Sequence, residues 1–202
     1  MTEQVKPYPL ISEAIRNGDK ERLAALLRAY PEMIDLDVPG FGTWLHYACA
    51  NGTLEIADLL VEMGFDVNAS DKREGQRPLS GAAEENKYDI ACFLLDKGAE
   101  MDVSTSVRNP LFAAIVGRSP EIANLLLMRG IDAKASYDSD TMKNMDAVAF
   151  AMMHGAHEIA HMIALHNADG DEAAAQAAMA EGLKIAHENT TPVPSGQDVR
   201  PS

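Results

Sequence analysis

The segment GFGTWLHYACANGTLEIADLLVEMG, residues 40–64, contains the pattern that decides the fold. An apolar residue is followed by a small residue three positions on, and by further apolar residues eleven, fourteen and fifteen positions on, at Leu45, Ala48, Ile56, Leu59 and Leu60. Spacings of three, four and eleven residues place side chains on one face of a helix, and Gly52 interrupts the run. The segment therefore predicts two short helices joined by a tight turn.

The same spacing recurs three more times along the chain. The residues equivalent to Leu45, here called lead residues, are Leu79, Leu111 and Val148, separated by 34, 32 and 37 residues. Each lead residue is followed three positions later by an alanine and eleven positions later by an isoleucine, at Ala82 and Ile90, Ala114 and Ile122, and Ala151 and Ile159. A period near 33 residues with a small residue at a fixed place predicts pairs of short helices that stack on one another.

Glycines indicate where the helices end. Second helices are predicted over residues 54–62 and 89–96, and Gly64, Gly98 and Gly130 stand where such helices stop. A residue with positive φ is favoured between the two helices of a pair, and we expect one at Gly52 and at Gly155. In the other two pairs, Asn86 and Gly117 are expected to serve this role. Polar, aspartate-rich loops follow at 65–76, 99–108 and 131–144.

Residues 40–48 resemble the pattern Gly-x-Thr-Pro-Leu-His-x-Ala of the ankyrin-repeat family, with Trp44 in place of the proline. The pattern returns in part at 76–82 and 109–114, and in worn form at 146–151. Upstream, residues 11–27 resemble a first, capping repeat. The resemblance implies an all-α ankyrin-repeat solenoid of about five helix-turn-helix units with hairpin-like loops. His46 is the histidine of the family pattern and is expected to form hydrogen bonds between adjacent loops.

The expected domain organisation is a single ankyrin-repeat domain over residues 1–188. Its units are expected near residues 8–40, 41–75, 76–107, 108–144 and 145–166. An alanine-rich segment predicts a C-terminal capping helix over 171–188. The remainder, 189–202, is polar with three prolines, and we predict a disordered tail.

Charge and composition exclude several classes of partner. The 202 residues carry a formal net charge of −14, which repels phosphate backbones and anionic membrane surfaces, so neither nucleic acid nor a membrane is an expected partner. The acidity is explained either by solubility alone or by a basic partner. No apolar stretch is long enough to span a bilayer, and the two cysteines have neither zinc nor disulfide spacing, so a cytoplasmic location is expected. We also expect the protein to be a monomer when it is free.

No set of residues predicts catalysis or a cofactor. His154, His157 and His161 lie close together, but zinc needs three or four converging ligands, and structural or solvated histidines are the favoured interpretation over a metal site. No nucleophile with a base, and no phosphate-binding glycine loop, is found. We therefore expect no enzyme activity, no cofactor and no metal.

The resemblance implies instead that a partner protein binds the concave face, on the loop tips and one side of each first helix. Residues two positions after each lead residue, such as Tyr47 and Phe150, are expected to line that face, and aromatic residues are favoured in protein interfaces. The candidate partner-binding residues are Trp44, Tyr47, Asn51, Asp71, Arg73, Glu74, Glu84, Glu85, Tyr137 and Phe150.

The leading hypothesis is a non-enzymatic protein-protein interaction module. The small, acidic chain also resembles bacterial ankyrin-type immunity proteins, which suggests the alternative of neutralising a basic toxin or effector by occluding its active site. A second alternative is a self-assembling structural protein.

Overall fold

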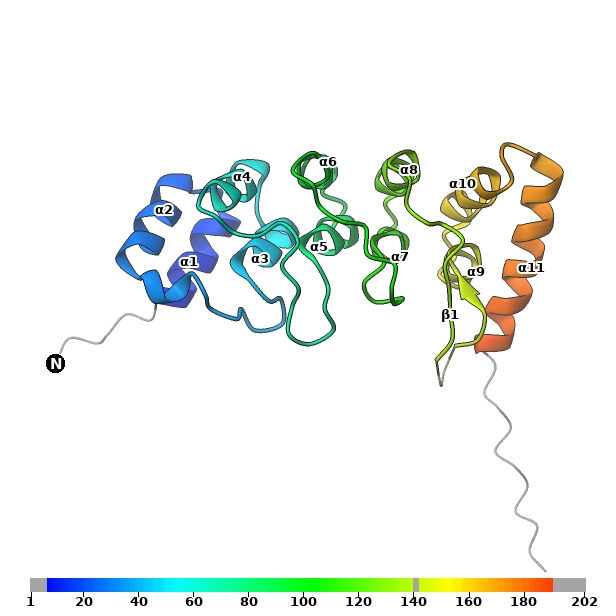
Figure 1. Ribbon diagram of the computed structural model, residues 1–202, viewed down its shortest axis with the longest axis horizontal. Coiled ribbons are helices and arrows are strands. Elements are labelled where there is room, and N and C mark those ends of the chain that lie inside the picture. The colour runs from blue at the N-terminus through cyan, green and yellow to red at the C-terminus, as the bar shows by residue number, and fades with distance from the viewer. Residues whose placement is uncertain (1–6, 140–141, 191–202) are drawn as a thin grey trace, which may run out of the picture. The chain divides into compact units, whose positions relative to one another are not determined.

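The computed structural model describes residues 7–139 and 142–190, and their contacts group the chain into two compact units (Figure 1). The first unit extends to Ala133 and the second begins at Lys134. Helices make up most of both units, which confirms the all-α prediction.

The first unit is built of four helix pairs. A short 3₁₀ helix, η1 (Pro31–Met33), follows the first pair. The pairs are α1 (Pro7–Arg16) with α2 (Lys20–Ala29), α3 (Trp44–Asn51) with α4 (Leu54–Glu62), α5 (Pro78–Glu84) with α6 (Tyr88–Asp96), and α7 (Pro110–Val116) with α8 (Pro120–Met128). The predicted helices at 54–62 and 89–96 are confirmed as α4 and α6, the latter beginning one residue earlier.

These helices form two layers. The first helices α1, α3, α5 and α7 contact one another in chain order, and so do the second helices α2, α4, α6 and α8 (Figure 1). The predicted repeat residues lie between the layers: Leu45, Leu79 and Leu111 are buried, as are Ala48, Ala82 and Ala114. The repeated alanines have short side chains, so neighbouring first helices can pack closely.

Glycines end the second helices for conformational reasons. Gly64, Gly98 and Gly130 have φ of 94°, 88° and 83°, and a β-carbon at any of them would meet nothing within 4 Å. The N–H of Phe65 donates to the carbonyl of Leu60, closing the helix with the left-handed glycine turn of a Schellman motif.

The predicted positive φ at Gly52 and Gly117 is wrong. Their φ values are −100° and −70°, and in the turn after α7 the left-handed residue is Arg118, at 51°. At Asn86 and Gly155 the predicted positive φ is confirmed, with values of 52° and 67°. Gly117 is required for space, because a β-carbon there would overlap the carbonyl oxygen of Glu84 and lie 2.7 Å from that of Ala83. The glycine thus allows α7 to approach the end of α5.

The second unit begins with a small antiparallel ribbon and continues with three helices. Strand β1 (Ser136–Tyr137) pairs with β2 (Met145–Asp146). Next come α9 (Ala147–Met153), α10 (His157–Asn167) and α11 (Glu172–Thr190). Asp146 caps α9 by accepting the N–H of Ala149 at 2.8 Å, and the lead residue Val148 is buried.

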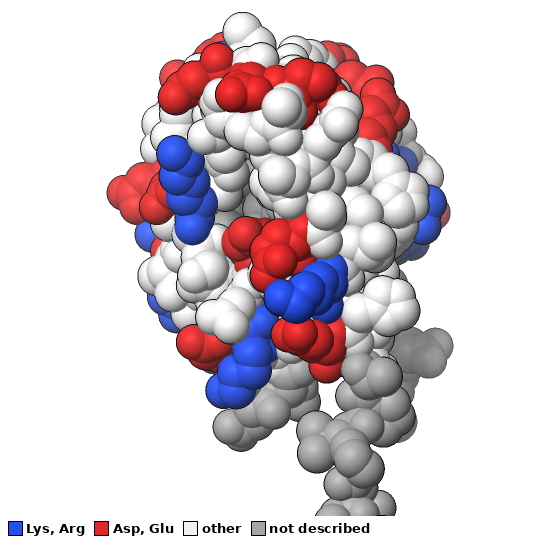
Figure 2. All heavy atoms as spheres, turned by 90° about the vertical axis from the view of Figure 1, so that its right-hand side faces the viewer, with Lys and Arg blue, Asp and Glu red and all other residues white. Residues whose placement is uncertain are grey.

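Helix α11 packs against α9 and α10. Its approach to α9 depends on Gly182, where a β-carbon would lie 3.0 Å from Val148 Cγ1 and 3.2 Å from the backbone nitrogen of Ala149. Figure 2 looks onto this side of the molecule and shows acidic side chains along its upper edge, with Lys and Arg among acids lower down.

The expected start of the tail at residue 189 is wrong. Asn189 and Thr190 belong to α11, and the Asn189 side chain is fixed by Lys143, accepting its N–H at 2.7 Å and donating to its carbonyl at 3.0 Å. The rest of the expected tail, 191–202, lies outside the described residues.

The glycines of the first helices provide a stability test. Gly117→Ala should destabilise the protein by about 1 to 3 kcal/mol, because the new methyl group meets backbone that cannot move aside. Gly81→Ala is the matched control: its β-carbon would meet Ala50 Cβ at an ordinary 3.7 Å, and alanine favours a helix, so stability should be unchanged or rise by about 0.5 to 1 kcal/mol. Urea unfolding measures both, and equal effects would contradict the close approach at Gly117.

Candidate functional site

A hollow lies in the first unit where the loops meet the first helices. Its volume is about 190 Å³, and we call it the groove. Its lining residues are Gly40, Phe41, His46, Ala50, Gln76, Arg77, Gly81, Glu84 and Glu85. A second hollow of about 310 Å³ lies between the loops that carry Phe41 and Asp71. Phe41 lines both hollows.

One wall of the groove is held by Asp71. Its carboxylate accepts backbone N–H groups of Arg73 at 2.7 Å, Glu74 at 2.8 Å, Gly75 at 3.3 Å and Gln76 at 2.9 Å. Partial burial opposes ionisation, but these four hydrogen bonds outweigh it and lower the pKa of Asp71. Asp71, expected to contact a partner, therefore directs its carboxylate into its own loop.

His46 connects this loop to α3. Its Nδ1 accepts the N–H of Thr43 at 3.1 Å, so the neutral ring carries its proton on Nε2 and donates to the carbonyl of Gln76 at 3.0 Å. The expected hydrogen bond between loop elements is thus confirmed. Burial lowers the pKa of His46 and outweighs the Gln76 hydrogen bond and the Asp71 charge, which raise it.

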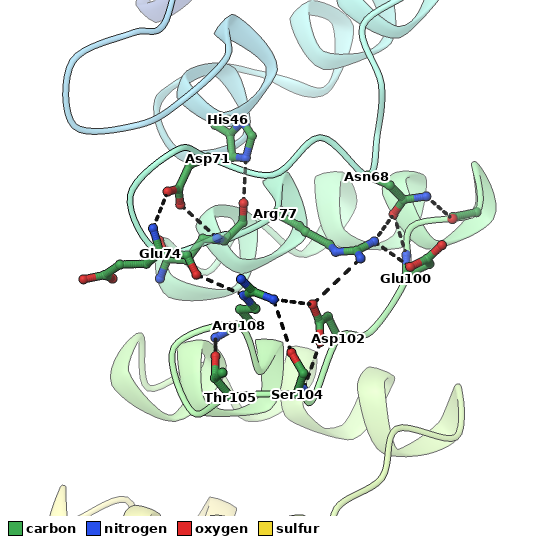
Figure 3. A network of polar contacts seen from close by, with 12 residues as sticks. His46, Asn68, Asp71, Glu74, Arg77, Glu100, Asp102, Ser104, Thr105 and Arg108 are labelled. Atoms are coloured by element: carbon green, nitrogen blue, oxygen red, sulfur yellow. Dashed lines mark hydrogen bonds and ion pairs between the residues drawn. The ribbon is translucent and has the colours of Figure 1, made fainter. Parts of the chain in front are cut away.

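A charged network ties this loop to the next one (Figure 3). Arg108 Nε donates to the carbonyl of Glu74 at 3.0 Å, and its guanidinium lies 3.9 Å from Asp102. Arg77 is bound by Glu100 at 2.7 Å and lies 3.8 Å from Asp102. The loop wall is therefore held by polar contacts on several sides.

Phe41 is the exposed aromatic residue of the groove. The residue is 37% exposed, and its ring packs edge-on against Tyr47, with centroids 4.9 Å apart. The periodic pattern does not include this loop position, so sequence reasoning missed it. A phenylalanine between Gly40 and Gly42 was the available signal.

Two predicted contact residues are not exposed. Trp44 is fully buried and donates its Nε1–H to the carbonyl of Met33 at 2.8 Å. Tyr47 is 7% exposed, and its hydroxyl accepts a hydrogen bond from Arg16 at 2.7 Å. The expectation that these rings form an exposed surface is wrong, because Trp44 packs on Tyr8 of α1, and Tyr47 packs against Phe41 and Arg16.

The other predicted residues are divided between the units. Glu84 and Glu85 are exposed and line the groove, while Arg73 and Glu74 are exposed on the loop beside it. Asn51 is half-buried and donates to the carbonyl of Tyr47. Tyr137 and Phe150 belong to the second unit and are half-buried, with the Phe150 ring 4.3 Å from that of His154.

The histidines of the second unit have other contacts. His161 Nε2 lies 3.0 Å from the Glu172 carboxylate, linking α10 to the start of α11. Within the described ranges, no group of three or more His, Cys, Asp or Glu side chains could hold a metal ion. In the same residues, no helix has the length and apolar character needed to cross a membrane.

Comparison with known proteins gives the family. A family model described as ankyrin repeats, in three copies, matches residues 11–105. The Notch-regulated ankyrin repeat-containing protein of Xenopus laevis is 34% identical over 92 residues, which cover 44% of this chain and 79% of that protein. The chain belongs to the ankyrin-repeat family.

Two further ankyrin-repeat relatives match over shorter shares of their length. The NF-kappa-B inhibitor cactus of Drosophila melanogaster is 32% identical over 110 residues, covering 50% of this chain and 22% of cactus. Protein phosphatase 1 regulatory subunit 27 of Mus musculus is 35% identical over 95 residues, covering 47% of this chain and 61% of the subunit. The match thus spans about a fifth of one relative and about three fifths of the other.

The buried histidine predicts a pH dependence of stability. Because the folded pKa of His46 lies below its ordinary value of 6.5, the unfolded chain binds a proton first as the pH falls. Unfolding free energy should therefore decrease below about pH 6.5, by at most about 1.4 kcal/mol per pH unit. His46→Asn should be less stable near neutral pH but lose less stability on acidification. Urea titrations at about pH 7.5 and about pH 5.5 measure the difference; equal losses would contradict this assignment.

Proposed function

We propose that this ankyrin-repeat protein is a non-enzymatic interaction module that binds a partner protein in the groove. The observation that carries the proposal is the combination, in one hollow, of an exposed aromatic ring with two exposed carboxylates. Phe41 supplies the ring, and Glu84 and Glu85 supply the carboxylates. Aromatic residues supply contact area at little cost in conformational entropy, whereas charged groups steer and orient a partner.

The relatives support a regulatory role. Cactus is named as an inhibitor of NF-kappa-B, and subunit 27 as a regulatory subunit of protein phosphatase 1. Both names describe proteins that act on another protein. By analogy, we propose that the present chain regulates its partner by occupying a surface of it.

The rigidity of the loop wall supports binding to a preformed surface. Asp71 fixes its own loop, His46 joins this loop to α3, and Arg108 joins it to the next loop. A partner then loses little free energy in ordering these loops. The same contacts argue against catalysis, since both ring nitrogens of His46 are hydrogen-bonded within the protein.

The charge of the groove favours a basic partner. Glu84 and Glu85 lie within a chain of net charge −14, so a basic surface would be attracted at long range and recognised at short range. Neutralisation of a basic toxin or effector is a narrower form of the same proposal, in which the groove covers the active site of the partner.

Filling the groove tests the proposal. Gly81→Phe places a ring in the hollow, since its β-carbon has room and the glycine lies within α5. Immobilised wild-type protein, Gly81→Ala and Gly81→Phe are each exposed to lysate of the source cells, and retained proteins are identified by mass spectrometry. We expect one partner held by the first two proteins and lost from the third, with affinity reduced about tenfold or more in calorimetry of the purified pair.

Equal melting temperatures of Gly81→Phe and Gly81→Ala establish that the groove, and not the fold, has changed. A partner bound equally by all three proteins would place the interface elsewhere and overturn the proposal.

A further inference from the structure

The two carboxylates of the groove lie at the C-terminal end of α5, where a negative charge is unfavourable. Glu84 is the last residue of α5 and Glu85 is its C-cap. The C-terminal end of a helix carries partial negative charge, so acids there reduce stability. At the equivalent positions, five and six residues after the lead residue, the three other repeats that have a lead residue carry neutral side chains or a histidine, namely Ala50 and Asn51, Val116 and Gly117, and Met153 and His154. This repeat alone places two acids at that site.

Neither carboxylate is paired with another residue in the described part of the chain. Both side chains are exposed, and neither forms a hydrogen bond or an ion pair with another described residue. Arg77 also lines the groove, but its guanidinium is bound by Glu100 at 2.7 Å and by Asn68 at 3.2 Å. His46 is neutral, because burial lowers its pKa. The groove therefore presents two carboxylates that no described residue pairs.

The ring of Phe41 lines the same hollow. Phe41 is partly exposed there and offers aromatic surface, and Ala50 and Gly81 line the same hollow without long side chains. A cation is attracted to an aromatic face and to carboxylates alike. A planar guanidinium satisfies both at once, since it stacks on a ring and donates two parallel hydrogen bonds to a carboxylate, whereas an ammonium is attracted to both only as a point charge.

We propose that the groove holds an arginine side chain of the partner, with its guanidinium stacked on Phe41 and hydrogen-bonded to Glu84 and Glu85. This inference rests on the proposed function, since the arginine belongs to a partner protein bound in the groove. It identifies the partner as one that presents an exposed arginine on an extended or protruding segment. Because Gly81 has no side chain, the groove keeps space for the guanidinium.

A library of random peptides displayed on phage tests the inference. Phage are selected on wild-type protein after depletion on Gly81→Phe, so the recovered peptides depend on an open groove. We expect arginine enriched at one position, and synthetic peptides in which this arginine is replaced by alanine should bind about tenfold more weakly or worse. Replacement by lysine should give an intermediate loss.

A double-mutant cycle locates the arginine. Glu84→Gln with Glu85→Gln should weaken the arginine peptide about tenfold and leave the alanine peptide almost unaffected. The matched control is Glu62→Gln with Glu121→Gln, which removes the same charge from exposed glutamates of α4 and α8 and should change affinity little. Phe41→Ala should also reduce the preference for arginine over lysine.

The outcomes separate this inference from the proposed function. Groove-dependent peptides without an enriched arginine, or with no coupling to Glu84 and Glu85, would overturn the inference and leave a binding groove in place. Recovery of no peptide that distinguishes wild type from Gly81→Phe would overturn both.

Discussion

Close packing of neighbouring first helices is the constraint on which the rest of the first unit depends. Ala48, Ala82 and Ala114 are buried without any exposed surface, and at Gly117 there is no room even for a methyl group. Such contacts require short side chains, because each added methylene would force helices apart. Beside these contacts, Ala50 and Gly81 leave the groove open, and its walls are formed by the loops and by the end of α5.

The loops serve as walls because their polar groups are satisfied internally. Without the hydrogen bonds from four backbone N–H groups to Asp71 the loop would be free to rearrange, and Arg108 of the neighbouring loop attaches it to the next repeat. Hydrogen bonds to ionised groups are stronger than neutral ones, so a few charged residues hold a long loop. Loop order, helix packing and the chemistry of the groove are therefore linked through side chains whose polar groups bind within the protein.

Much of the fold could be predicted from the sequence, because spacing determines which residues face the core. The lead residues, the repeated alanines and the glycine stops lie where the periodicity indicated, and His46 makes the expected hydrogen bond. Periodicity does not report how large side chains pack. Trp44 and Tyr47 share the face expected for contact but are covered, since Tyr8 lies 5.3 Å from the Trp44 ring and Arg16 reaches the Tyr47 hydroxyl. Contacts made across loops, such as those of Phe41 and Asp71, have no period and could not be placed.

Binding of a partner in the groove is measured most directly by the amide chemical shifts of the labelled protein. On titration with a groove-selected arginine peptide, we expect the largest shift changes at Phe41, Ala50, Gly81, Glu84 and Glu85. If the largest shift changes fall instead on the second helices α2, α4, α6 and α8, with the groove residues unaffected, binding in the groove is contradicted.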